Sequence, residues 1–388
     1  MDKQLKRKKL SEQFSCIYIG MITVYYMLSI SKVTEQYYLN PDIIVYAAIP
    51  ILILAVFTKK AELSTIALFF ILICIGLLSA VITHKSTLLL TSTEIACCFD
   101  TDIKKIAKTM LSIEIIALVF NICMVITGVV INETVQYHRI VSFFGNGPVF
   151  RNSLGFSHYN NLGLVFFEIS TLYLIVLEKY KTGVSIGNVL IFVLNIIIYF
   201  VSGDRTAFVS FILLVILISV VKIDNIGKYY KNIANFCIGV FPIICSWGIV
   251  FLYERIPNLY NLINNLFQTR PFYIYEYISR YGIKMLGNNI SGPIFGLWGD
   301  PSQAANTTLD SGFANLVVVY GVILTIAYII MMLLLIRKLN KFKQYYWIAY
   351  IIVICFYGVS ENVVVFFTYN FCWMIIPIIF RKNEGELK

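Results

Sequence analysis

The sequence predicts an all-α fold, a single polytopic membrane domain of bundled helices over residues 1–388. Of these residues 59% are hydrophobic and only 13% are charged, and the mean hydropathy is +0.79. A soluble domain carries about 25% charged residues. Apolar runs close to the roughly 20 residues that a bilayer core requires recur along the whole chain, which indicates many membrane crossings.

Eleven apolar runs of spanning or near-spanning length succeed one another. They occupy residues 14–31, 41–57, 62–82, 110–131, 155–177, 187–202, 206–221, 233–253, 312–336, 345–360 and 362–380. With eleven crossings the basic cluster 3–9 would face outward, against the cytoplasmic preference of Lys and Arg. The stretch 86–99 supplies one more crossing if it pairs with the run before it, although a re-entrant helix remains an alternative. We therefore expect about twelve transmembrane helices and cytoplasmic termini.

The basic residues divide by type between the two predicted sides. The cytoplasmic side receives 19 Lys and 3 Arg, and the outer side 3 Lys and 6 Arg. The planar guanidinium of Arg binds phosphate or carboxylate through two parallel hydrogen bonds. The outer Arg residues therefore indicate an anionic ligand, with two alternatives left open: anchoring to lipid headgroups, or pairing with Glu133, Asp204, Glu254 and Glu276.

Two long segments are predicted outside the membrane. The first is residues 132–154, and the second is residues 254–311, which are rich in Tyr, Asn, Gly and Pro. Loops of this length are usually either functional or disordered, and aromatic and amide groups suit sugars. Residues 271–281 have amphipathic spacing, so we expect an interfacial helix there, with an aromatic belt at headgroup depth as the alternative.

The stretch from Arg151 to Gly163 places a guanidinium and an imidazole among amides and glycines, where a polar loop meets an apolar run. It resembles the outer-face pattern R-x-S-x-G-F-x-H-P-N of the Wzy-type repeat-unit polymerases of capsule and O-antigen synthesis, which are related to O-antigen ligases. The matching residues are Arg151, Ser153, Gly155, Phe156, His158 and Asn160, and Tyr159 replaces the Pro.

Three later segments are also similar to that family, in the same order along the chain. They are Ser202 to Ala207, resembling an S-x-R-T-A turn; Leu309 to Phe313 followed by Tyr320 and Gly321; and Glu361 with Asn370 and Phe371. The resemblance covers the chain from about residue 100 onward.

The resemblance implies a GT-C-like glycosyltransferase at the outer face of a bacterial plasma membrane, acting in capsular polysaccharide synthesis. Such an enzyme moves a growing glycan from undecaprenyl pyrophosphate to the non-reducing end of a new lipid-linked repeat unit. Its partners would be undecaprenyl-pyrophosphate-linked oligosaccharides and the lipid bilayer. Chain-length regulator and flippase proteins of the same pathway are implied by the resemblance alone.

The chemistry implied by the resemblance selects the candidate residues. A pyrophosphate leaving group requires cations, which Arg supplies without a metal or another cofactor. The candidate pyrophosphate ligands are Arg151, Arg205, Arg255, Arg270, Arg280, Asn160 and Asn161. The attacking sugar hydroxyl needs a base, for which His158, Asp310 and Glu361 are candidates. A structural role for His158, bonding a loop carbonyl, stays open.

Other features indicate structural roles or exclude other functions. The nine cysteines lie in apolar segments without a CxxC spacing, so neither a disulfide framework nor a zinc site is expected. Asp100 and Asp102 form a DxD that is better explained as a helix N-cap than as a metal site. The net charge of +10 is scattered between spans, so a nucleic-acid partner is not expected. Glu114 and Glu168 lie within spans, where acids are functional candidates or buried hydrogen-bond partners.

Two alternative functions remain open. A ligase that transfers a finished chain to another acceptor would use the same donor chemistry. A flippase or exporter of lipid-linked oligosaccharides would place its charges along a central cavity, whereas here Arg is concentrated on one predicted side.

Overall fold

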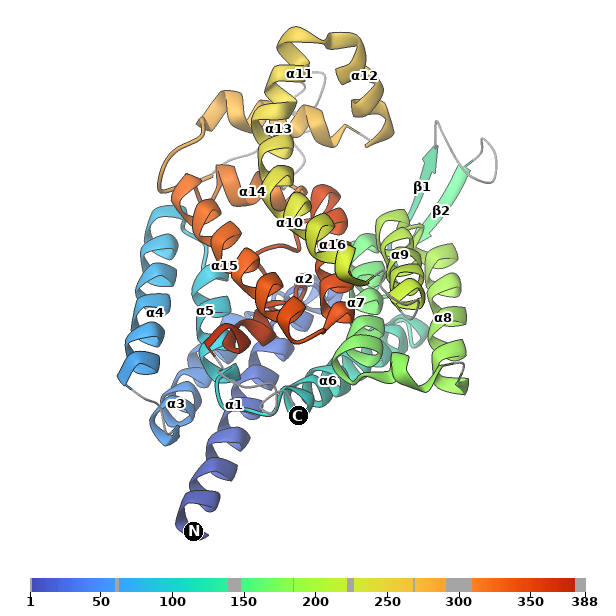
Figure 1. The fold of residues 1–388 in the computed structure, drawn as a ribbon. Coiled ribbons are helices and arrows are strands. Elements are labelled where there is room, and N and C mark those ends of the chain that lie inside the picture. Colours follow the sequence, from blue (N-terminus) through green and yellow to red (C-terminus); the bar gives the residue numbers. More distant parts are fainter. Residues whose placement is uncertain are drawn as a thin grey trace. The chain divides into compact units, whose positions relative to one another are not determined.

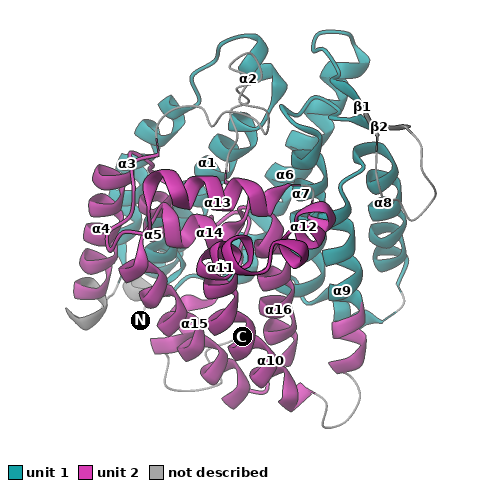
Figure 2. Ribbon diagram, turned by 90° about the horizontal axis from the view of Figure 1, so that it is seen from above, with its two compact units in different colours: residues 1–66, 93–215 teal, residues 67–92, 216–388 magenta. Residues whose placement is uncertain are grey.

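The computed structural model describes residues 2–59, 63–138, 148–183, 185–221, 227–267, 269–290 and 309–380. These ranges hold sixteen α-helices and one two-stranded antiparallel hairpin, so the all-α prediction is confirmed (Figure 1). The chain divides into two compact units: unit 1 contains residues 1–66 and 93–215, and unit 2 contains residues 67–92 and 216–388 (Figure 2).

Unit 1 is built mainly from long helices and carries the hairpin. Its elements are α1 (Asp2–Ser29), α2 (Lys32–Gln36), α3 (Asp42–Thr58), α6 (Ile103–Ile126), β1 (Thr134–His138), β2 (Pro148–Asn152), α7 (Tyr159–Thr171), the π-helix η1 (Leu172–Val176), the 3₁₀-helix η2 (Lys179–Thr182), α8 (Ile186–Ser202) and most of α9 (Arg205–Val221).

Unit 2 contains the helices that follow α9 in the chain. They are α10 (Gly227–Ile243), the π-helix η3 (Ile244–Gly248), α11 (Ile249–Arg255), α12 (Pro257–Leu266), α13 (Arg270–Tyr281), α14 (Gly312–Val318), α15 (Val322–Lys341), α16 (Tyr345–Ser360) and the 3₁₀-helix η5 (Trp373–Phe380). Two further helices, α4 (Leu63–Thr83) and α5 (Thr87–Cys98), are divided between the units.

Four stretches of the described helices are long and apolar enough to cross a membrane: Ile103–Ile126, Tyr159–Val176, Gly227–Arg255 and Val322–Lys341. They support a multi-pass membrane protein. The prediction of about twelve spans is wrong, because six other apolar helices have only 10–17 residues. A helix that crosses a core of about 30 Å needs about 20 residues.

One end of unit 1 gathers the basic N-terminal segment and several helix ends. Arg7 donates from Nε to the carbonyl of Thr58, the last residue of α3, at 3.0 Å. In the first turn of α6, Lys105 binds Glu12 of α1 at 2.5 Å. The starts of α1 and α6 therefore lie beside the end of α3, so α3 runs antiparallel to α1.

Two further lysines tie other segments of unit 1 to the same end. Lys59 is buried, and its Nζ donates to the carbonyls of Ala96 at 2.9 Å and Cys97 at 2.7 Å. These bonds join the end of α3 to the last turn of α5 within unit 1. Lys104 binds Glu178, just beyond η1, at 2.7 Å. This contact brings the end of α7 and η1 to the start of α6.

The centre of unit 2 is α16, which is buried over most of its length. A helix that is apolar on all sides is suited to a protein interior. It packs against α10, α14 and α15. The segment 363–372, expected to continue as a membrane helix, is irregular and, apart from Phe366, buried, and only residues 373–380 form a 3₁₀-helix.

Buried irregular backbone must find hydrogen-bond partners inside the protein. Thr91 donates to Val365 O at 2.9 Å, and the hydroxyl of Tyr350 accepts from Phe371 N at 3.0 Å. Asn370 donates to Val364 O at 2.9 Å. These side chains satisfy the segment in place of helical bonds.

Candidate functional site

The motif that opens at Arg151 forms a hairpin strand, a tight turn and a helix start within unit 1. In the hairpin, Arg151 of β2 lies opposite Val135 of β1. Gly155 has a φ of +87°, and a Cβ there would lie 2.6 Å from the carbonyl oxygen of Asn121. Only glycine adopts this conformation without strain and allows so close a backbone approach.

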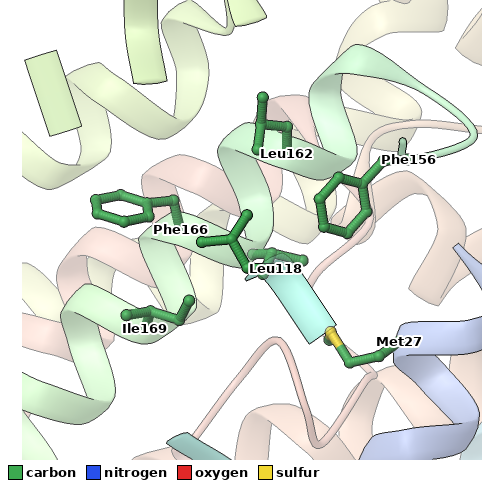
Figure 3. Close-up of a cluster of buried hydrophobic side chains, with 7 residues drawn as sticks. Met27, Leu118, Phe156, Leu162, Phe166 and Ile169 are labelled. Atoms are coloured by element: carbon green, nitrogen blue, oxygen red, sulfur yellow. The ribbon is translucent and has the colours of Figure 1, made fainter. Parts of the chain in front are cut away.

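The turn is joined to the end of α1 by backbone hydrogen bonds. Lys32 N donates to Gly155 O, and Ser157 N donates to Ile30 O, each at 2.8 Å. Phe156 is fully buried between α1, α6 and α7, in an apolar cluster with Met27, Leu118, Leu162, Val165, Phe166 and Ile169 (Figure 3). The burial of Phe156 in this apolar cluster therefore fixes the position of the polar turn.

Arg151 is only 6% exposed, and its guanidinium carbon lies 4.5 Å from the ring centre of Tyr159. This cation–π contact links the end of β2 to the first residue of α7. The pattern of the Wzy-type polymerases has Pro at the position of Tyr159, so from the sequence Tyr159 was only a departure from that pattern. Tyr159 instead supplies the aromatic ring over which the guanidinium of Arg151 lies. The presence of Arg151 earlier in the same motif was the sequence signal that could have revealed this contact.

His158 is the exposed N-cap of α7, and its Nδ1 accepts the backbone N–H of Asn160 at 3.2 Å. Because a neutral imidazole carries its proton on one nitrogen, this bond assigns the proton to Nε2. Asn161 donates to Ser157 Oγ at 3.1 Å, and Asn160 is half-buried beside it.

A second predicted motif, residues 202–207, packs against the first within unit 1. A Cβ on Gly163 would lie 2.5 Å from Oδ2 of Asp204, so α7 and this turn are in direct contact. Asp204 accepts from the backbone N–H groups of Thr206 at 3.0 Å and Ala207 at 3.2 Å. Its role is to cap α9, and it holds the half-buried Arg205 at the first position of that helix.

In unit 2 three predicted residues converge. Arg270, the first residue of α13, donates from Nη2 to Oε1 of Glu361 at 2.5 Å, and its Nε lies 3.6 Å from Oδ2 of Asp310. The side chains of Arg270 and Glu361 are 17% and 16% exposed, whereas that of Asp310 is 43% exposed. The arginine is therefore held by one largely buried carboxylate and faces a second that solvent can reach.

Backbone contacts fix the positions of the two carboxylates. Glu361 ends α16, and its carbonyl accepts from Gly312 N at 3.1 Å. Ser311, next to Asp310, caps α14 by accepting from Ala314 N at 3.4 Å. The end of α16 and the start of α14 are thereby joined, which places Asp310 and Glu361 on either side of the same arginine. We name Arg270, Asp310 and Glu361 the arginine–carboxylate cluster.

The helices next to the arginine–carboxylate cluster carry aromatic rings. Tyr253 of α11 stacks on Tyr275 of α13 with ring centres 3.8 Å apart, and Tyr260 of α12 meets Tyr253 edge-on at 5.0 Å. Burial, with a smaller effect from Tyr253, raises the pKa of Tyr260 to about 12, so this phenol stays protonated. Arg255 and Arg280 are exposed at the ends of α11 and α13. The predicted helix over 271–281 is present as α13.

Several features singled out from sequence have structural roles. Asp102 is the N-cap of α6 and accepts from Lys104 N at 2.9 Å, which confirms the helix-cap interpretation of the DxD. Asn370 holds the irregular segment of unit 2. Glu133, considered as a partner for an outer Arg, binds Lys32 instead, at 2.5 Å. Arg139 lies outside the described residues.

The two intramembrane acids Glu114 of α6 and Glu168 of α7 are fully buried in unit 1. Among the described residues neither has a hydrogen-bond partner. Glu168 therefore lies in the interior of unit 1. Within the same described ranges, no group of three His, Cys, Asp or Glu could hold a metal ion.

No family model, no curated protein and no solved structure matches this chain. What can be said of its function therefore rests on the two sites described above.

Proposed function

We propose that the protein is a membrane glycosyltransferase that polymerises lipid-linked oligosaccharide repeat units at the outer face of a bacterial plasma membrane. The observation that carries the proposal is the arginine–carboxylate cluster. Its members come from three segments separated by 40 and 51 positions along the chain, and each was selected from sequence for this chemistry.

The cluster has the groups that a glycosyl transfer needs. The acceptor hydroxyl attacks the anomeric carbon of the donor, the bond from that carbon to the pyrophosphate oxygen breaks, and undecaprenyl pyrophosphate leaves with the bonding electrons. The hydroxyl proton must pass to a base. We assign Asp310 as this base because it is the carboxylate accessible to a substrate, and we assign Glu361 to hold Arg270.

Two arginines and several tyrosines of unit 2 suit the phosphates and the sugar rings of the substrate. Arg255 and Arg280 are exposed cations that can meet the phosphates, which bind the fork of Arg in a bidentate manner. The tyrosines of α11 to α13 offer flat apolar faces against which sugar rings stack. Charge stabilisation by the protein in this way requires no metal, in keeping with the expectation of no cofactor.

Unit 1 has its own set of candidate groups, at the first motif. His158, the exposed N-cap of α7 beside the amides of Asn160 and Asn161, is a candidate hydrogen-bond partner for a phosphate or sugar oxygen. Arg151 is too enclosed to face a large ligand directly. We therefore assign Arg151 as a positioning residue, which holds the turn through its contact with Tyr159. Arg205 is kept as a candidate phosphate contact in unit 1.

Orientation in the membrane follows from the basic end of unit 1. Arg7, Lys59, Lys104 and Lys105 lie at one end, and the positive-inside tendency makes that end cytoplasmic. The hairpin and His158 then face outward. A ligase would use the same donor chemistry and is the closest alternative.

The deciding experiment is a gel of lipid-linked glycans from cells that lack this gene, complemented with wild type, Asp310→Asn or Asp42→Asn. Asp42 is exposed at the start of α3, so its variant is a matched control for the loss of one carboxylate. We expect a ladder with wild type and Asp42→Asn, and a single outward-facing repeat with Asp310→Asn. Repeats retained on the cytoplasmic leaflet in the null strain would identify a flippase and refute the proposal. If the null strain contains single lipid-linked repeats together with long chains that have not been transferred to their final acceptor, the protein is a ligase.

A further inference from the structure

A cavity of about 520 Å³ opens in unit 2 between the start of α10 and the end of α15. It is lined by Lys231, Leu334, Arg337, Lys338, Asn340, Lys341 and Ile379. Its volume falls within the range of about 300–1,000 Å³ that is typical of small-ligand pockets. None of these residues belongs to the sites described above.

The lining is strongly cationic. Four of its seven residues are Lys or Arg, and no Asp or Glu lines it among the described residues. Like charges in one concave space repel each other unless an anion enters between them. The cavity therefore favours a ligand with more than one negative charge or a localised one such as phosphate.

The cations are not explained by helix electrostatics alone. Arg337, Lys338 and Lys341 occupy the end of α15, where the helix dipole stabilises positive charge. Lys231 lies near the start of α10, where the dipole gives a cation no stabilisation. It is nonetheless half-buried and directed into the same cavity.

The remaining lining indicates an amphiphile. Leu334, 46% exposed, and Ile379 provide apolar surface beside the charges. Helix α15 is one of the apolar stretches long enough to cross a membrane, and its cations begin where its apolar sequence ends. Basic pockets between membrane helices at this level bind anionic lipid headgroups.

We propose that this cavity is a phosphate-binding site for the headgroup of an anionic phospholipid, with the phosphate between Lys231 and Arg337 and the acyl chains over Leu334 and Ile379. The inference does not rest on glycosyl transfer, since it uses neither the arginine–carboxylate cluster nor the His158 loop. A free phosphate compound shares the headgroup chemistry but gains nothing from the apolar lining.

The test measures binding of soluble short-chain lipids to the purified full chain in a neutral detergent. The ligands are dihexanoyl phosphatidylglycerol, dihexanoyl phosphatidylcholine and inorganic pyrophosphate. Each basic residue near an anionic lipid contributes about 1 kcal/mol, or about a factor of five, so Lys231→Gln/Arg337→Gln should weaken phosphatidylglycerol binding about 25-fold. Lys231→Arg should retain it.

The matched control is Lys228→Gln/Lys343→Gln. It removes one exposed cation from α10 and one from just beyond α15, both outside the cavity, and should bind as wild type does. If Lys231→Gln/Arg337→Gln does not purify as a folded protein, Lys231→Gln alone should show about a fivefold loss. Binding of pyrophosphate with the same dependence on Lys231 would identify a free phosphate as the occupant of the site. Equal binding of phosphatidylcholine and phosphatidylglycerol, or equal losses in the test and control variants, would overturn the proposal.

Discussion

The contact between Arg270 and Glu361 makes a quantitative prediction about stability. The two side chains are 17% and 16% exposed and are joined at 2.5 Å. Removing one partner from a buried pair costs about 3–5 kcal/mol, because a charge is left uncompensated. Since about a sixth of each side chain still reaches solvent, we expect Arg270→Met to destabilise the protein by about 3 kcal/mol, the lower end of that range.

A double-mutant cycle separates the pair from its surroundings. Glu361→Gln should cost about 2 kcal/mol and the double variant about 3 kcal/mol, which gives a coupling energy of about 2 kcal/mol. The same cycle with Asp310→Asn should give only about 0.5 kcal/mol, because that contact is longer and more exposed. Unfolding in mixed micelles of a mild detergent and dodecyl sulfate provides the measurement.

Two results would contradict this reasoning. A coupling between Arg270 and Glu361 below about 0.5 kcal/mol would show that the pair is solvated. A coupling to Asp310 as large as that to Glu361 would show that the two carboxylates are not divided into a holding group and an accessible one. In that case the assignment of Asp310 as the base would lose its structural support.

Three further predictions concern unit 1, the first of them with a control glycine from α10 of unit 2. Gly163→Ala should lose about 1–3 kcal/mol because its methyl group meets Asp204, whereas Gly239→Ala, with open space around it, should gain about 0.5–1 kcal/mol; equal effects would refute the close packing. Burial alone would raise the pKa of Glu178, but hydrogen bonds from two lysines outweigh it and lower the pKa, so its stabilisation is present above the unfolded pKa and is lost as the pH falls through the folded one. The melting temperature of Glu178→Gln should thus be below that of wild type at pH 7, and the two should converge in strong acid. A difference in melting temperature that does not change with pH would show that the stabilisation does not come from the ionised carboxylate. His158→Asn should keep the cap of α7, while His158→Ala should lose about 1 kcal/mol, and both should weaken the glycan ladder; an intact ladder with Asn would leave the imidazole with only a capping role.

The sequence was sufficient to predict the helices but not the number of full-length spans. Hydropathy reports that a segment will be buried, and it does not report in which conformation. Residues 363–372 are apolar enough to be scored as a membrane helix, yet they form irregular backbone satisfied by Thr91, Tyr350 and Asn370. These partners lie up to 276 positions away, so no local pattern could have revealed them.

The sequence offered the candidate site residues one by one and gave no sign that three of them cluster. Arg270, Asp310 and Glu361 were chosen for their side-chain chemistry, and nothing in their spacing indicated that they meet. The cation–π contact of Arg151 with Tyr159 was missed because position 159 was judged only against a pattern that has Pro there.

The structure also divides the outer arginines by role. Arg151 lies over an aromatic ring, and Arg270 forks between two carboxylates, both of them arrangements that a planar guanidinium serves better than an ammonium. For these two residues the preference for Arg over Lys is explained within the protein. The guanidinium carbon of Arg280 likewise lies 5.5 Å from the ring centre of Tyr281, whereas Arg255 is exposed at the end of α11. Under the proposed function, Arg255 is therefore the stronger candidate of these two arginines to meet a phosphate.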